Sequence, residues 1–234
     1  DNLSGLLTTA FLARDLLRNG IPQYSWRFVF LPETIGAIAY LKHNETAMRK
    51  LRGALVATTC GGPGPLGYKE TFLVNHLVDR AIRLAFRDLA VDPIRYPFAP
   101  DGSDERQYSS PGFRIPAASI TKDKYYEYPE YHTASDNLSF VNGGQISESL
   151  TIYREVIQIL ENNAQYLSTS PNGEPRLGRR NLYPEVGGGI NQSVNEDAMQ
   201  DKKNIDAMTW ILFLSDGEHD LVTISERSGL AFSQ

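Results

Sequence analysis

The sequence predicts an α/β fold in which a mostly parallel sheet is covered by helices on both faces. Two features support this expectation. Short apolar runs alternate along the chain with longer segments whose apolar residues recur at helical spacing. The apolar runs contain few polar residues, which is typical of strands that are buried on both faces of a parallel sheet.

Four elements are expected in the first part of the chain. Leucines and alanines form an apolar stripe at helical spacing over residues 3–19, and a glycine and a proline follow it. An apolar run with aromatic and β-branched residues predicts a buried strand over residues 25–31. A helix is expected over residues 33–41, and a second apolar run predicts a strand over residues 53–59.

Four further elements follow before the chain changes character. GGPGPLG, residues 61–67, is a loop by composition. Residues 75–89 carry an apolar helical face, and residues 113–121 predict a third strand after a Ser-Pro-Gly turn. A long amphipathic helix is expected over residues 146–164.

The C-terminal part has a different composition. It begins with a segment rich in Gly, Pro, Asn and Ser, and it ends with a helix over residues 220–227, a Ser-Gly-Leu turn and the first residues of what would be a second helix. This is the pattern of a helix-turn-helix, so we expect a fragment that is truncated at both ends. The expected division is an α/β domain over residues 1–167, a loop or linker over 168–197, and the start of a winged helix-turn-helix domain over 198–234.

The composition excludes several classes of protein. The chain has 234 residues, of which 41% are hydrophobic and 22% charged, as in ordinary globular proteins. The net charge of −5 argues against a general nucleic-acid or anionic-membrane surface. The single cysteine, Cys60, excludes an internal disulfide framework, and no apolar run reaches the ~18–20 residues that span a bilayer. We therefore expect a cytoplasmic protein without a membrane partner.

His132 has the most informative surroundings of the four histidines. It lies in KYYEYPEYHTASDNL, a segment dense in tyrosine and carboxylate. Asp136 follows four residues later and can hold the far N–H of the imidazole, as carboxylates commonly do for metal-binding histidines. A packed aromatic turn explains the same residues without a metal, and both readings stay open.

Two carboxylates stand where expected elements meet. Glu33 follows an expected strand, at the edge where ligands bind in open α/β sheets, although a helix start also favours a carboxylate. Asp1 precedes the first helix and is either an N-cap or an anionic metal ligand.

Taken in order, these motifs resemble the zinc aminopeptidase superfamily. Asp-x-x-Ser-Gly opens an apolar helix, an apolar strand ends in Glu, and Tyr-His-Thr-x-x-Asp-x-Leu follows late in the chain. LPETIGAIAYL, GSDERQYSSPGF and EYPEYHTASDNLSFV are similar to bacterial proteins that have an aminopeptidase-like domain followed by a winged helix-turn-helix. The resemblance implies a zinc-exopeptidase-like three-layer sandwich with a truncated, winged-helix-like C-terminal segment.

The resemblance also implies roles for single residues. Asp1 and His132 match metal ligands, Asp136 matches a carboxylate that orients the histidine, and Glu33 matches the general base. SDERQYSSPG would form part of the pocket wall. The residues expected to bind the substrate are Asp104 or Glu105, for an α-amino group, Arg106, for a carboxylate, and Tyr131.

The chain departs from the superfamily pattern around the metal. Thr34 stands where a second glutamate is common, ATTCGGPG offers no carboxylate, and the first histidine ligand would precede Asp1. Zinc is the expected cofactor, with one ion favoured over two. Glu33 would be base or ligand but not easily both, and the fragment is expected to be inactive.

The implied function is zinc-dependent hydrolysis of amide bonds in a peptide or an aminoacyl small molecule, with metal-activated water as the nucleophile. A non-catalytic module that binds a peptide or a sugar-linked amine is an alternative, because metal-ligand carboxylates are missing. The C-terminal segment could instead serve regulation. Its last 19 residues contain four carboxylates and one basic residue, Arg227, so we expect protein contacts, including homo-oligomer contacts, rather than nucleic acid.

Overall fold

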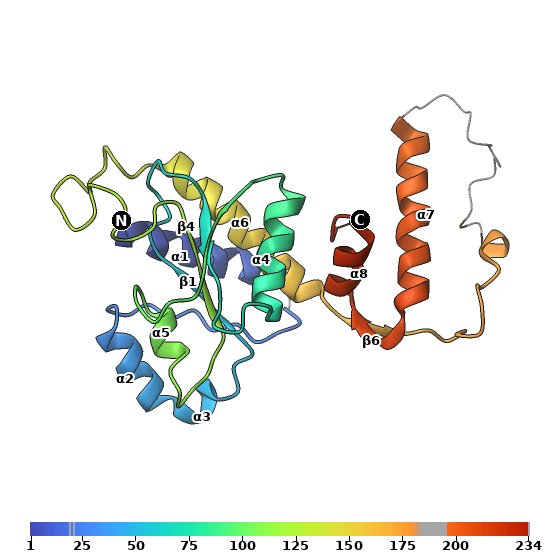
Figure 1. Cartoon of the computed structure of the whole chain (residues 1–234), viewed down its shortest axis with the longest axis horizontal. Helices are drawn as coiled ribbons and strands as arrows, with labels where there is room; N and C mark the ends of the chain where they lie inside the picture. Colours follow the sequence, from blue (N-terminus) through green and yellow to red (C-terminus); the bar gives the residue numbers. More distant parts are fainter. Residues whose placement is uncertain (19, 21, 181, 183–195, 234) are drawn as a thin grey trace. The chain divides into compact units, whose positions relative to one another are not determined.

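A four-stranded sheet lies at the centre of the N-terminal part of the chain (Figure 1). The structure is a computed structural model that describes residues 1–18, 20, 22–180, 182 and 196–233. The strands β1 (Ala54–Ala57), β2 (Gly67–Lys69), β3 (Ile94–Tyr96) and β4 (Ala117–Thr121) lie in the spatial order β1-β4-β2-β3. β1 and β4 pair in parallel, as do β2 and β3, whereas β2 and β4 are antiparallel. The mostly parallel sheet that the sequence predicts is therefore confirmed.

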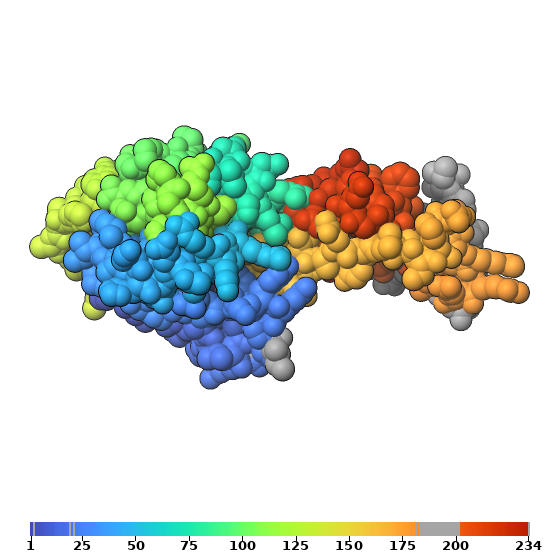
Figure 2. Space-filling view, turned by 90° about the horizontal axis from the view of Figure 1, so that it is seen from below, coloured from blue at the N-terminus to red at the C-terminus, as the bar shows by residue number. Residues whose placement is uncertain are grey.

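Helices cover both faces of this sheet (Figure 1). One layer consists of α1 (Asn2–Arg18), α4 (Leu77–Asp88) and α6 (Gly143–Asn162). The opposite layer consists of α2 (Ile35–His43), α3 (Glu45–Met48) and α5 (Glu105–Tyr108). Figure 2 shows α2 and α3, in lighter blue, at the surface of this unit. These three layers make up the first of two compact units, residues 1–162, and confirm the predicted fold class.

The position of α1 depends on one glycine. A Cβ atom on Gly5 would lie 2.1 Å from the backbone oxygen of Ala57, so only glycine lets the helix approach β1 this closely. Thr8 and Leu12 are buried on the same side of α1. The helix therefore lies directly on β1, with its first residue at the carboxyl end of that strand.

The sequence of α4 specifies both its N-terminal cap and its buried face. The side chain of His76 accepts the N–H of Val78, and Asp79 accepts the N–H of His76, which is a capping box. The apolar face of the helix is buried between the sheet and α6, with Ala81, Ile82 and Ala85 fully enclosed. The helix expected over residues 75–89 is confirmed with boundaries shifted by one or two residues.

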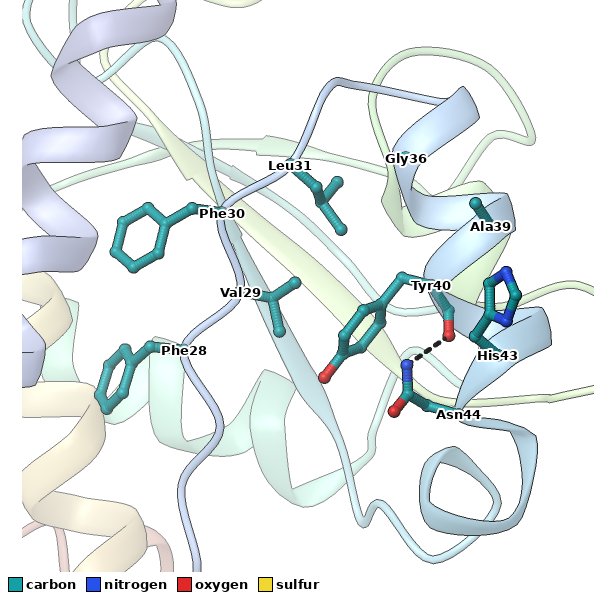
Figure 3. A pocket seen from close by; sticks show the side chains of 9 residues that line it. All are labelled: Phe28, Val29, Phe30, Leu31, Gly36, Ala39, Tyr40, His43 and Asn44. Carbon is teal, nitrogen blue, oxygen red and sulfur yellow. Dashed lines mark hydrogen bonds between the residues drawn. The ribbon is translucent and has the colours of Figure 1, made fainter.

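The strand expected over residues 25–31 is wrong. The segment has no strand assignment and joins no sheet of the described chain. In Figure 3, Phe28 and Phe30 point to one side while Val29 and Leu31 point toward α2, so the alternation of a strand is present. Val29, Leu31 and Tyr40 line a shallow pocket of about 430 Å³ there. The ends of the segment are held by side chains instead: Glu161 accepts the N–H of Gln23, and Asp104 accepts the N–H of Thr34.

Two other elements differ from the expectation. The strand expected over residues 113–121 begins only at Ala117, because Ser110 accepts two backbone N–H groups and Arg114 adopts a positive φ of 52°. The short strands β2 and β3 were not foreseen, since three residues are too few to show a period.

The second unit, residues 163–234, is built around an antiparallel pair, β5 (Gln165–Leu167) and β6 (Asp216–Asp220). η1 (Leu177–Arg180) and α7 (Glu196–Leu214) lie between these strands in the sequence, and α8 (Leu221–Ser228) follows them. Asp220 caps α8 by accepting the N–H of Thr223, and Gly229 ends it with a φ of 73°. Residues 181 and 183–195 of the expected linker lie outside the described residues. None of the described helices is long and apolar enough to cross a membrane.

Candidate functional site

Asp1, one of the predicted site residues, lies at the carboxyl edge of β1 and β4. The two strands are parallel neighbours, so the segments that follow them leave the sheet at the same edge. Asp1 is tied to the loop after β1, because its Oδ2 atom accepts the N–H of Gly61 at 2.8 Å. Ser4 joins the two segments again: its hydroxyl donates to the carbonyl of Asp1 and accepts the N–H of Cys60. The first turn of α1 is thereby fixed at the sheet edge.

The carboxylate of Asp1 has one atom without a partner. The side chain is 0% exposed, and its Oδ1 atom has no hydrogen-bond donor within the described part of the chain. Asp136 lies beside Asp1, with its carboxylate on the backbone amino nitrogen. The structure therefore brings together two of the predicted residues that are 135 positions apart.

His132 is not held by Asp136, as the sequence predicted, but stacks on a tyrosine. Its ring stacks on Tyr131 with the centroids 4.0 Å apart, and its side chain is exposed. The backbone of His132 has a φ of 57°, which is uncommon for a residue with a side chain. Asp136 contacts Asp1 and makes no hydrogen bond to His132 among the described residues, so its expected role in orienting the histidine has no support in this geometry.

Glu33 lies next to an unusual turn. Thr34 has φ 63° and ψ −70°, and the carbonyl of Glu33 accepts the N–H of Ile35 at 2.8 Å. This is a γ-turn with a positive central φ, a rare and strained conformation. The N–H of Thr34 donates to Oδ1 of Asp104 at 2.7 Å. Glu33 is thus exposed at the rim of a turn whose shape is fixed by a carboxylate 70 residues away.

Electrostatic effects show that the predicted pocket residues lie close to Glu33. Burial raises the pKa of Asp104, the N–H of Thr34 lowers it, and the negative charge of Glu33 raises it further. Burial raises the pKa of Tyr131 to about 12, and the neighbouring Tyr126 and Glu33 add to this. The Nε atom of Arg106 is buried and lacks a partner within the described residues. The charge of Glu33 thus acts on both Asp104 and Tyr131.

Glu105 was predicted as a possible substrate-binding residue, but the structure encloses its side chain. The side chain is 0% exposed, and its carboxylate accepts from Lys69 at 2.8 Å, from Tyr125 at 2.9 Å and from Ser119 at 3.3 Å. Lys69 also donates to the backbone oxygen of Asp101. A carboxylate that is enclosed and engaged in this way is part of the framework and is not presented to a substrate.

Two residues at this edge were not singled out from the sequence. Asp123 follows β4 by two residues, and its Oδ2 atom accepts the N–H of Gly64. A Cβ atom on Gly64 would lie 1.9 Å from this carboxylate, so the glycine makes room for it. The hydroxyl of Tyr128 is buried without a partner among the described residues, and burial with the charges of Asp136 and Asp123 raises the tyrosine pKa. Like Glu33, Asp123 follows an expected strand, so the same criterion could have identified it as a candidate.

The described residues fit a metal ion only in part. The orphaned oxygen of Asp1 is what a buried ligand without its cation would show. A catalytic zinc ion is normally held by three protein ligands. No group of three or more His, Cys, Asp or Glu side chains with such geometry occurs in the described residues. The described residues therefore contain no complete metal site.

A cleft of about 1090 Å³ lies between residues 24–33 and β1. Its walls are mostly apolar and include Leu3 and Leu6 of α1 together with the free edge of β1. Glu33 and Asp104 are among the few carboxylates that line it. Glu33 therefore lies at the exposed rim of this cleft.

Comparison with known families identifies the architecture. Residues 1–163 match the model of a family described as a domain of unknown function, DUF4910, and residues 164–234 match a winged helix-turn-helix family. The chain belongs to the DUF4910 family. The boundary between the two matches falls one residue from the division between the two compact units.

Individual proteins are similar to this chain in sequence or in fold. A Clostridium acetobutylicum protein, described as a candidate polysaccharide biosynthesis protein with an aminopeptidase-like domain, is 38% identical over 232 residues, which is 99% of this chain and 51% of that protein. The crystal structure of a candidate peptidase from the same organism matches with a TM-score of 0.85 and 35% identity, over 100% of this chain and 50% of the other. LapA of Legionella pneumophila shares the fold, with a TM-score of 0.55 and 17% identity over 69% of this chain and 47% of LapA.

These matches confirm the kinship with aminopeptidase-like proteins that carry a winged helix-turn-helix. The chain spans about half the length of the two Clostridium proteins. Activity, substrate and partners of the whole protein are therefore matters of proposal.

Proposed function

We propose that the protein is an aminopeptidase-like hydrolase that cleaves amide bonds in a peptide or an aminoacyl small molecule. The observation that carries this proposal is the strained γ-turn at Thr34, which presents Glu33 beside Asp104 and Tyr131. Strained backbone persists only where its surroundings impose it, and it is concentrated at functional sites.

The roles of the residues follow from their positions. Glu33 is exposed at the rim of the turn and accepts the proton of the attacking water, which it returns to the leaving amine. Tyr131, whose pKa is raised to about 12, stays protonated at neutral pH and can donate a hydrogen bond to the substrate. The guanidinium of Arg106 would bind a substrate carboxylate.

Zinc is the proposed cofactor, with one ion favoured. Asp1 and His132 would hold it, and when bound it would polarise the scissile carbonyl and lower the pKa of a water molecule. The remaining ligands would come from outside the described residues. Asp136, which lies beside Asp1, would help to fix its position.

The proposal is tested on the natural protein. Bound metal is measured by elemental analysis, and hydrolysis is followed with a panel of aminoacyl p-nitroanilides. We expect about one zinc ion per chain and release of p-nitroaniline that Glu33→Gln reduces by at least ~100-fold without loss of metal. Asp1→Ala and His132→Ala should lose the metal. Zinc-loaded protein that cleaves none of the panel would refute the aminopeptidase assignment.

A non-catalytic binding module is the second candidate. It is favoured by one observation, the lack of a complete metal-ligand group among the described residues. This candidate predicts that peptides or sugar-linked amines bind, as measured by calorimetry, with equal affinity before and after metal chelation. Metal-dependent turnover would exclude it.

Cytoplasmic location and contacts between copies through the C-terminal unit also remain proposals. The last residues carry Asp216, Glu218, Asp220 and Glu226 against Arg227, a balance that favours protein over nucleic-acid partners. Sedimentation of the chain with and without residues 163–234 tests whether copies associate through the C-terminal unit.

A further inference from the structure

We infer that Asp104 is a positioning residue that holds the turn at Glu33 in its strained shape, rather than a residue that binds the substrate. This inference rests on the proposed function of Glu33. It assigns to Asp104 the control of where the proposed base points.

The turn needs an external restraint. Thr34 is β-branched and is held at φ 63° and ψ −70°, a region that residues with a Cβ atom avoid. Two local bonds span the turn: the N–H of Ile35 donates to the carbonyl of Glu33, and the N–H of Gly36 donates to that of Pro32. A closed turn of this kind is strained, so a free chain would relax to an ordinary turn and Glu33 would point elsewhere.

Asp104 supplies the restraint. Its Oδ1 atom accepts the N–H of Thr34, the central residue of the turn, at 2.7 Å. A hydrogen bond to a carboxylate is about twice as strong as a neutral one. Relaxing the turn would rotate this N–H away from Asp104 and leave a half-buried carboxylate without its donor.

The carboxylate itself is rigidly placed. Asp104 immediately precedes α5. The first residue of this helix, Glu105, accepts hydrogen bonds from Lys69 and Tyr125. Tyr108 at the other end of α5 is buried against Ala37 and Leu41 of α2, the helix that follows the turn. The two partners of the hydrogen bond thus stand on elements that share one core, which is the arrangement that a fixed distance requires.

The competing role is direct contact with the substrate amine, and variants separate the two. Asp104→Ala removes the acceptor. Asp104→Asn keeps an oxygen acceptor for Thr34 but removes the charge that would attract an amine. Thr34→Gly lets residue 34 adopt the positive φ without a steric penalty, so it should compensate for a lost restraint and should not compensate for a lost substrate contact. Asp92→Ala, at an exposed aspartate away from the turn, serves as the matched control.

Two readouts are taken on the natural protein. Hydrogen exchange of the residue 34 amide, measured by NMR, reports the turn without any need for activity. We expect Asp104→Ala to accelerate this exchange at least ~10-fold and to lower kcat by ~10–100-fold with little change in KM. Asp104→Asn should restore most of both values, and the Asp104→Ala, Thr34→Gly double variant should recover most of the lost kcat.

The outcomes separate this inference from the proposed function. A protein without hydrolytic activity whose residue 34 amide still responds to Asp104→Ala would refute the hydrolase and retain the restraint. Unchanged exchange in Asp104→Ala would overturn the inference, whatever the activity. A rise in KM that neither Asp104→Asn nor Thr34→Gly reverses would also overturn it, in favour of substrate contact.

Discussion

Lys69 is the residue whose removal should destabilise the first unit most clearly. It is 3% exposed, and its ammonium group donates to Glu105 and to the backbone oxygen of Asp101. Glu105 has no exposed surface at all. Lys69→Met would leave that carboxylate in the interior without a counter-charge, with only the hydroxyls of Tyr125 and Ser119 as donors. Breaking one side of a buried ion pair costs about 3–5 kcal/mol.

The measurement is thermal unfolding of the natural protein followed by circular dichroism. For a unit of this size, 1 kcal/mol shifts Tm by about 2–4 °C, so we expect Lys69→Met to lower Tm by roughly 6–20 °C. Lys69→Met combined with Glu105→Met removes both charges, and it should recover at least half of the loss because an apolar pair of similar volume replaces the ions.

A surface carboxylate provides the control for this experiment. Glu45 pairs with Arg49 four residues later on an exposed helix, at 2.7 Å. Because this pair is exposed to solvent, Glu45→Gln should shift Tm by no more than about 2 °C. A Lys69→Met shift as small as that of Glu45→Gln, or a double variant no more stable than Lys69→Met alone, would refute the reasoning that burial makes this pair indispensable.

Three other predictions follow from single residues. The buried hydroxyl of Tyr153 bridges Val56 and Ile120 of neighbouring strands, so Tyr153→Phe should lower the free energy of unfolding in urea by about 1–3 kcal/mol, and a neutral substitution would contradict this. Burial raises the pKa of the Cys60 thiol to about 12, so iodoacetamide should label it at pH 8 only after denaturation. Backbone N–H groups of Glu218 and His219 lower the pKa of Asp216 to about 2. The contribution of this carboxylate to stability should therefore be complete above about pH 4 and lost as the pH falls toward 2. An NMR titration of Asp216 with an ordinary midpoint near 3.8 would contradict this.

The sequence predicted the helices that cover the sheet better than it predicted the strands. Helical periods over residues 3–19, 75–89 and 146–164 predicted α1, α4 and α6, because an amphipathic helix records its buried face in its own sequence. The run over residues 25–31 shows strand alternation, and Figure 3 shows its side chains alternating. It forms no ladder, because pairing depends on which backbone edge lies alongside, and no local pattern records that.

The site shows the same division between local and distant information. Local features of the sequence marked Asp1, Glu33, His132 and Asp136 as candidates, and the resemblance carried by the order of the motifs supplied their expected roles. Only the tertiary structure decided that Asp136 contacts Asp1, that Glu105 is enclosed, and that Asp104 binds the turn at Thr34. These contacts join residues far apart in the chain. Their distances follow from how α5 and α2 pack together and from where the chain leaves β4, which no short stretch of sequence encodes.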